Sequence, residues 1–151
     1  MKYTINKETK MDRTFKPSHL TRDERAVMTS IQNGLEYFRC FAGKTPASRE
    51  WANARYWELQ NEKSRIQIEA HDRCRRTAIE EACTILSEIA WKGGFGCYDE
   101  QVNYEGMLKD FEKAAALLRP WGFVERGTTF VNLDRQTAIR TEYSPTEIDL
   151  N

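Results

Sequence analysis

The chain has 151 residues, of which 40% are hydrophobic and 30% are charged. This length supports one domain with its own apolar core, and the composition is that of a folded protein rather than a disordered one. Lysine plus arginine and aspartate plus glutamate number 23 each, so the whole chain has no general electrostatic attraction for nucleic acid or an anionic membrane.

Two kinds of membrane or export segment are not expected from the sequence. No apolar run reaches the roughly 20 residues of a transmembrane helix. The N-terminal segment has basic residues but lacks the apolar core of a secretory signal. We therefore expect no membrane association and a cytoplasmic location.

Residues 1–20 are polar and net basic, and we expect them to form a flexible arm. The segment TRDE at 21–24 then has the spacing of a capping box, which predicts the start of a helix. Apolar residues at helical spacing follow, with Gly43 as the expected stop, so the first helix is placed near 22–42. Gly34 inside it costs about 1 kcal/mol of helix stability relative to alanine. We interpret this glycine as the site of a close helix–helix contact.

A second helical pattern begins near Pro46 and contains neither proline nor glycine before Trp91, and Gly93 and Gly94 end it. A helix of about 45 residues is about 68 Å long. A globular domain of this chain length has a diameter of only roughly 40 Å. We therefore expect the helix to be kinked, to protrude, or to pair with a second copy of the chain, and we predict a homodimer formed through it.

Glycines recur in the segment KGGFGCYDEQVN, residues 92–103. A phosphate cradle would need a helix N-terminus directly after the glycines, whereas here they follow the end of a helix, so a C-cap and a turn are predicted instead. A third helix is expected near 104–119, where apolar residues return at helical spacing and Pro120 ends the pattern.

The last third of the chain changes to an alternating apolar and polar pattern. Two short apolar stretches on either side of Gly127 predict a β-hairpin, and residues 137–143 suit a third strand. This β element covers about 122–143, and residues 144–151 are predicted to be an acidic tail.

The predicted architecture is therefore mainly α. It is a three-helix bundle with one long central helix, kinked or paired, and a small C-terminal antiparallel β-hairpin or meander. A single helical domain is expected over residues 21–143.

The segment 65–76 is rich in arginine. Acidic neighbours such as Glu69, four residues before Arg73, balance most of its charge, so a solvated, salt-bridged helix face is the favoured interpretation. Arg75 projects among apolar residues, which predicts a buried or intersubunit contact. The alternative is a nucleic-acid interface, in which a helix followed by a hairpin imitates a winged helix. Its candidate residues are Arg65, Arg73, Arg75, Arg76 and, at the hairpin tip, Arg126.

Metal binding was weighed at His71 and Cys74, which are three residues apart. Two further ligands, such as Cys40 and Cys97, would have to come from elsewhere. Cys83 points almost opposite Cys74, so one site cannot easily use both. With no CxxC pair in a chain of this size, we expect reduced thiols, no metal and no other cofactor.

The sequence carries no catalytic signature. It has no GxSxG, HExxH or P-loop motif and no ExxH pair, and its second histidine, His19, falls in a predicted loop. We therefore expect a protein that is not an enzyme.

The segment REWANARYWELQ presents Trp51, Arg55, Tyr56 and Trp57 within about two helical turns. Tryptophan, tyrosine and arginine are the favoured anchors of protein interfaces, although the first helix and the hairpin could instead cover them. The favoured function is a non-enzymatic accessory, adaptor or inhibitor-type protein that occludes or bridges a partner protein. Small chains without motifs are common among such proteins in bacteriophages and mobile elements. The alternative is a nucleic-acid-binding module.

Overall fold

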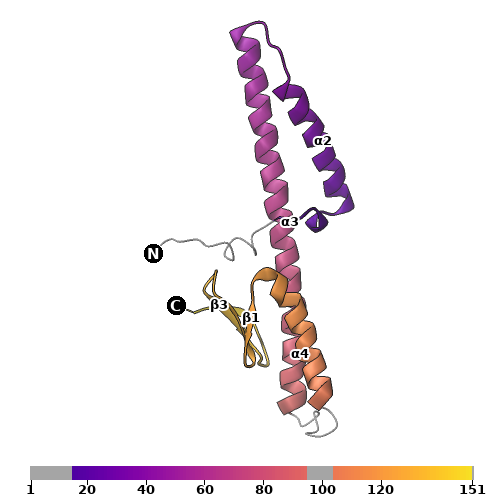
Figure 1. Cartoon of the computed structure of the whole chain (residues 1–151), viewed down its shortest axis with the longest axis vertical. Coiled ribbons are helices and arrows are strands. Elements are labelled where there is room, and N and C mark those ends of the chain that lie inside the picture. The colour runs from indigo at the N-terminus through magenta and orange to yellow at the C-terminus, as the bar shows by residue number, and fades with distance from the viewer. Residues whose placement is uncertain (1–14, 95–103, 151) are drawn as a thin grey trace. The chain divides into compact units, whose positions relative to one another are not determined.

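The computed structural model describes residues 15–94 and 104–150 (Figure 1). The predicted mainly α fold, with a long middle helix and a C-terminal antiparallel β element, is confirmed. In chain order the elements are the 3-10 helix η1 (Pro17–His19), the helices α2 (Arg22–Arg39), α3 (Pro46–Gly94) and α4 (Tyr104–Leu118), the 3-10 helix η2 (Arg119–Trp121) and the strands β1 (Val124–Arg126), β2 (Thr129–Asn132), β3 (Thr137–Arg140) and β4 (Glu147–Asp149).

The described chain divides into two compact units. The N-terminal unit is Phe15–Cys74 and the C-terminal unit begins at Arg75. Helix α3, which has 49 residues, contributes to both. The sequence predicts one helical domain over residues 21–143, and apolar periodicity alone does not show where one core ends and another begins. Most of the predicted flexible arm, residues 1–14, lies outside the described residues.

Helix α2 begins with the predicted capping box. The backbone N–H of Thr21 donates to Glu24 Oε1 at 2.9 Å, and that of Glu24 donates to Thr21 Oγ1 at 3.2 Å. The helix ends at Arg39, earlier than predicted, because the next residue has left helical geometry at φ −94° and ψ 4°. Gly43, the expected stop, instead lies against the first turn of α3, where an added Cβ would be 2.8 Å from Ser48 Oγ.

Helix α2 packs on the first part of α3 around a small apolar core. Gly34 faces this contact, since a Cβ added there would lie 2.8 Å from Leu59 Cδ1. The close approach predicted from Gly34 is therefore confirmed. The core consists of the buried residues Ile31, Leu35 and Ile66, with Leu20, Met28, Tyr56 and Leu59 packed around them.

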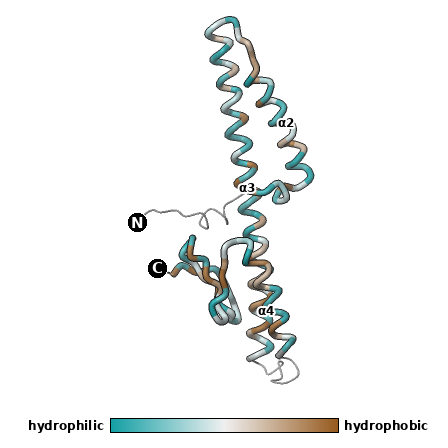
Figure 2. Tube along the Cα trace, viewed as in Figure 1, coloured by the Kyte–Doolittle hydropathy of each residue, from teal (hydrophilic) through white to brown (hydrophobic). Residues whose placement is uncertain are grey.

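The C-terminal unit has a denser core. Figure 2 shows more apolar residues on α4 and the last part of α3 than on α2. The rings of Phe111 on α4 and Phe130 on β2 stack with centroids 5.0 Å apart, and Lys92 Nζ on α3 lies 3.7 Å from Asp110 Oδ2 on α4. The largest fully buried side chains here are those of Leu86, Leu118, Phe123, Phe130, Asn132 and Ile139.

The β element is a four-stranded antiparallel meander in the order β1-β2-β3-β4. The predicted hairpin around Gly127 is confirmed, and this glycine has the positive φ of 63° that a side chain would disfavour. The third strand ends at Arg140, before the predicted end at 143. The acidic segment 144–151 contains β4, which pairs with β3. Three residues are too few for an alternating pattern to predict a strand.

Candidate functional site

Aromatic side chains gather where α2 ends and α3 begins. The Phe38 ring meets the Trp51 ring edge-on with centroids 5.4 Å apart, and Phe41 meets the same tryptophan at 5.9 Å. Tyr37 contacts Phe38 at 4.9 Å, also edge-on. Each such pair stabilises by about 0.5–1.5 kcal/mol beyond its buried area. We call these four residues, Tyr37, Phe38, Phe41 and Trp51, the aromatic cluster.

The local sequence explains this arrangement. Helix α2 ends at Arg39, so the chain turns directly after Tyr37 and Phe38 and carries Phe41 toward α3. Helix α3 starts beside it, because Ser48 N donates to Thr45 Oγ1 and Thr45 N donates to Ser48 Oγ, both at 3.1 Å. These reciprocal bonds satisfy backbone groups at the start of α3. The turn that carries the cluster therefore lies between two defined helix ends, the C-terminus of α2 and the N-terminus of α3.

A surface hollow of about 340 Å³ opens beside the cluster. Its only charged lining residues are Arg39, whose guanidinium also binds Glu36, and Arg49, whose guanidinium donates to the Gly43 carbonyl at 3.3 Å. The hollow is thus lined by aromatic side chains together with two arginines and an asparagine. Its lining residues are Phe38, Arg39, Phe41, Arg49, Ala52, Asn53 and Tyr56.

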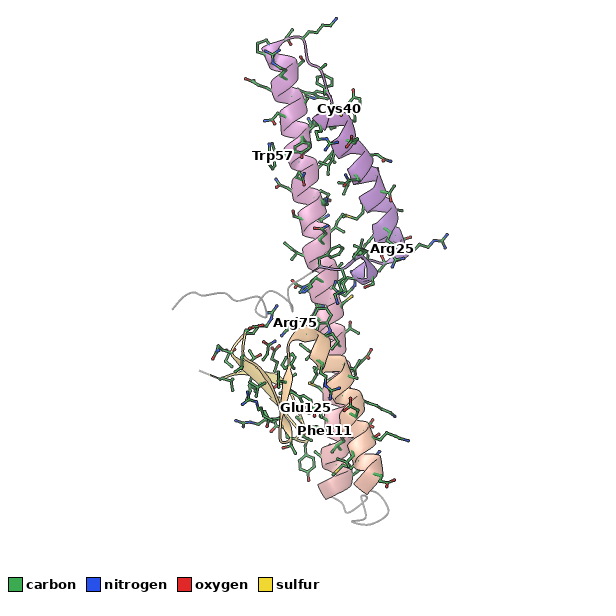
Figure 3. The ribbon with its side chains drawn as sticks, in the orientation of Figure 1. Arg25, Cys40, Trp57, Arg75, Phe111 and Glu125 are labelled. Carbon is green, nitrogen blue, oxygen red and sulfur yellow. The ribbon has the colours of Figure 1, made fainter. Side chains whose placement is uncertain are left out.

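The structure divides the four predicted partner-binding residues. Trp51 belongs to the aromatic cluster and is 47% exposed, and Tyr56 lines the hollow and packs on the core. Arg55 is exposed and forms an ion pair with Glu58. Trp57, 56% exposed, lies on the side of α3 away from α2 (Figure 3). Of the four residues, only Tyr56 lines the hollow, and Trp51 is connected to it through its contacts with Phe38 and Phe41.

Sequence reasoning missed the contribution of α2 to this surface. Tyr37, Phe38 and Phe41 fall within five residues of the printed sequence. Phe38 was assigned to the apolar stripe of its helix, and nothing in one helix shows which residues of another lie opposite it. The density of aromatic residues before the expected turn was the available signal.

The arginines of the alternative nucleic-acid interface have acidic partners in most cases. Arg65 hydrogen-bonds Glu62 and Glu69 within its own helix. Arg73 was expected to pair with Glu69, but its Nη1 and Nη2 donate to Glu24 of α2 at 2.9 and 2.8 Å. The prediction failed because a residue from a second helix is closer than the helical neighbour.

Arg75 confirms the expectation of a buried contact. It is 12% exposed and pairs with Glu147 of β4 at 2.8 Å. Arg76 and Arg126 are exposed. Of the five candidate residues, three therefore hold carboxylates of the same chain, and each carboxylate cancels charge that a phosphate would otherwise meet.

His19, His71, Cys40 and Cys74 lie in the N-terminal unit, whereas Cys83 lies in the C-terminal unit. The Cys74 thiol donates to the backbone carbonyl of His19 at 3.5 Å, and the His19 and His71 rings meet edge-on at 5.6 Å. Within residues 15–94 and 104–150, no group of three or more potential metal ligands occurs. Cys40 is an exposed free thiol, and Cys97 lies outside the described residues.

Comparisons of this chain found no matching family model, no matching curated protein and no matching solved structure. In the part of the chain that the structure describes, no helix is both long enough and apolar enough to cross a membrane. Function must therefore be argued from the surface chemistry alone.

Proposed function

We propose that this chain is a non-enzymatic protein-binding protein of the accessory, adaptor or inhibitor type, which holds a partner protein at the aromatic cluster. One observation carries the proposal. Trp51 is 47% exposed although it contacts the rings of Phe38 and Phe41, and these two phenylalanines line a hollow of about 340 Å³. Exposed aromatic residues beside a pocket are the usual centre of a protein interface.

The hollow favours a partner segment with two chemical features. Its aromatic lining residues, Phe38, Phe41 and Tyr56, suit one large apolar side chain as an anchor. Arg39 and Arg49 at its margin suit carboxylates on the same segment, since guanidinium groups bind carboxylates with two parallel hydrogen bonds. An acidic segment with an apolar anchor is the chemistry that fits both.

The mechanism we propose is occlusion or bridging. The edge-on contacts within the aromatic cluster hold its rings before any partner arrives, so binding loses little side-chain freedom. A bound segment is then masked from its other partners, or is held near whatever the remainder of the chain binds. We place this function in the cytoplasm, where Cys40, Cys74 and Cys83 remain free thiols.

Native mass spectrometry of the protein purified gently from its source cells tests the proposal. The wild type should carry a stoichiometric partner protein that nuclease does not remove. Trp51→Ala should reduce the retained partner about tenfold or more, as expected for an anchor residue, and Arg49→Glu should also reduce it. Val27→Ala is a matched control, because Val27 is equally exposed at 47% but outside the cluster.

Two results would contradict the proposal. Equal retention of the partner by wild type, Trp51→Ala and Val27→Ala would show that the cluster is not the binding surface. A complex with nucleic acid in place of protein, lost at high salt, would support the nucleic-acid alternative. That alternative stays a prediction, which the ion pairs of Arg65, Arg73 and Arg75 do not favour.

A further inference from the structure

The face of α3 opposite α2 carries a stripe of exposed side chains without charge. Trp57 and buried Ile66 are nine residues apart, which at about 100° per residue puts them on opposite sides of the helix. Trp57 and Ile68 are 56% and 61% exposed, although both are large and apolar. The stripe, which we call the seam, consists of Ala54, Trp57, Asn61, Ser64 and Ile68.

The seam has the spacing of a coiled coil. Its residues alternate steps of three and four, which is the 3.5-residue repeat that keeps one face of a helix against a partner helix. Charged residues flank it at Glu58 and Arg65 but do not interrupt it. A helix face that contacts only solvent usually carries charged residues, whereas all five seam positions are uncharged.

We propose that the seam binds the seam of a second copy of this chain, with the two helices antiparallel. This surface is separate from the aromatic cluster, so the inference does not rest on the proposed function. The two-fold axis would pass between Glu62 and Lys63. Trp57 then meets Ile68 of the partner subunit, so that large apolar residues share a layer at each end of the segment 57–68, and Ala54 lies beyond this contact.

The centre of the seam fits the same arrangement. Asn61 faces the partner subunit's Ser64. The side-chain amide and the hydroxyl can each donate and accept a hydrogen bond, so the two residues can bind each other. A polar residue at such a position specifies register and orientation at some cost in stability. A parallel arrangement would instead place each of these residues against its own copy, including the two bulky Trp57 side chains.

The flanking charges decide between the two orientations. In the antiparallel register, Glu58 approaches Arg65 of the partner subunit, and the symmetry repeats this ion pair at the other end. In the parallel register, Glu58 would approach the partner subunit's Asn53, and Arg65 would approach the partner subunit's Gln60, with no opposite charges facing each other. Charge complementarity at these flanking positions selects orientation in coiled coils.

The ion pairs that Glu58 and Arg65 form within one chain do not prevent them from pairing with a second copy. Glu58 pairs with Arg55, and Arg65 pairs with Glu62 and Glu69, in contacts whose side chains are all at least 41% exposed. Exposed pairs of this kind contribute little to stability, so Glu58 and Arg65 can turn toward a second copy at small cost.

The seam is short, which sets the expected strength. Beyond Ile68 the next positions are occupied within the chain itself, since His71 is buried and Arg75 binds Glu147. Contact from Trp57 to Ile68 is about 18 Å long, and interfaces of this size belong to the weak, reversible class. We therefore expect self-association at micromolar rather than nanomolar concentrations.

Sedimentation velocity of the full chain over a micromolar concentration range tests the inference. The wild type should pass from monomer to dimer. Trp57→Asp should weaken association about tenfold or more by placing a charge in the seam. Glu58→Arg and Arg65→Glu should each weaken it, because each brings like charges together, and the double variant should associate again within about threefold of the wild type.

Arg25→Glu is the control, because Arg25 lies on α2 and points away from α3 (Figure 3). It should leave association unchanged, as should Trp51→Ala, and circular dichroism should show each variant folded. A monomer throughout the range would overturn the inference. So would a dimer that Trp57→Asp does not weaken, and a double charge reversal that fails to restore association would exclude the antiparallel orientation.

Discussion

Arg75 and Glu147 form a bidentate ion pair between α3 and β4. Nη1 donates to Oε1 at 3.0 Å and Nη2 donates to Oε2 at 2.8 Å. The two side chains are only 12% and 21% exposed. Thr137 Oγ1 donates to the same carboxylate at 2.6 Å, and the Arg75 guanidinium lies 5.7 Å from the centre of the Phe123 ring. A charge so enclosed depends on its partner.

Replacing Glu147 with glutamine should therefore destabilise the C-terminal unit. The variant leaves the Arg75 charge largely enclosed without a carboxylate, which should lower the free energy of unfolding by about 2–4 kcal/mol, somewhat less than for a wholly buried pair. Urea unfolding followed by circular dichroism measures this change. Glu36→Gln, which removes the carboxylate of an exposed ion pair with Arg39, should leave the urea midpoint unchanged.

The same pair predicts acid sensitivity. Burial alone would raise the pKa of Glu147, but hydrogen bonds from Arg75 and Thr137 outweigh burial and lower it. Because the folded pKa lies below the unfolded value, the pair stabilises the protein above that unfolded value, and the contribution is lost as the pH falls through the folded pKa. Glu147→Gln should therefore show a weaker loss of stability in acid than the wild type, and an equal loss would contradict this.

Gly34 and Leu59 should behave as a coupled pair. Gly34→Val gains helix propensity but places side-chain atoms where Leu59 Cδ1 lies 2.8 Å from an added Cβ, so we expect a loss of about 1–3 kcal/mol from overpacking. Adding Leu59→Ala should make the double variant more stable than the sum of the two single losses predicts. Thermal unfolding of the wild type, the two single variants and the double variant measures the coupling. Strictly additive losses of stability would show that the helices do not meet there.

The contrast between Gly34 and Arg73 shows what the sequence can predict. Gly34 interrupts an otherwise regular helical pattern, and such a local exception has few explanations besides close packing, so its contact could be expected. Arg73 has acidic neighbours at helical spacing, which predicted a pair with Glu69. Its actual partner, Glu24, is 49 positions away, and no local pattern carries that information.

The pKa of Glu24 should be low and should depend on Arg73. Hydrogen bonds from the Arg73 side chain and then from the Thr21 backbone lower the pKa of Glu24 from 4.5 to about 2. Its stabilising contribution is therefore present above pH 4.5 and is lost as the pH falls toward 2. NMR titration of the Glu24 carboxyl carbon should show its pKa rising toward 4.5 in Arg73→Met. Arg65→Met, which removes a helical ion pair elsewhere, should not change it.

His19 should make the N-terminal unit less stable in mild acid. Burial, and then the positive charges of His71 and Lys16, lower the pKa of His19 below 6.5. The other charged groups around it are Asp72, beside His71 Nδ1 at 3.3 Å, and Arg73, which binds the His19 carbonyl. Since the folded protein favours the neutral ring, stability is full above pH 6.5 and falls as the pH drops toward the folded pKa.

NMR titration of the histidine ring protons checks this directly. In His71→Gln the pKa of His19 should rise, because one source of positive charge beside it is removed. An unchanged pKa of His19 in that variant would show that His71 does not contribute to the lowering.

The sequence predicts only part of the candidate site. Trp51 and Tyr56 are predicted as interface anchors from their residue types, and the structure places Tyr56 in the hollow and Trp51 against Phe38, which lines it. Arg55 and Trp57 are predicted by the same criterion and fall within the same two helical turns, yet neither lines the hollow. A helix turns by about 100° per residue, so adjacent residues face different directions, and only the position of α2 shows which direction is open.

Strand β4 has a consequence for the behaviour of shortened chains. It covers one edge of β3, whose Ala138 and Ile139 are buried, while β2 covers the other. A chain that ended before Glu147 would leave the backbone donors and acceptors of residues 137–140 open along that edge. Open, apolar strand edges are templates for pairing with other chains. Strand β4 therefore protects the chain from aggregation by covering this edge. A chain without β4 should form insoluble assemblies rather than remain as unfolded monomers.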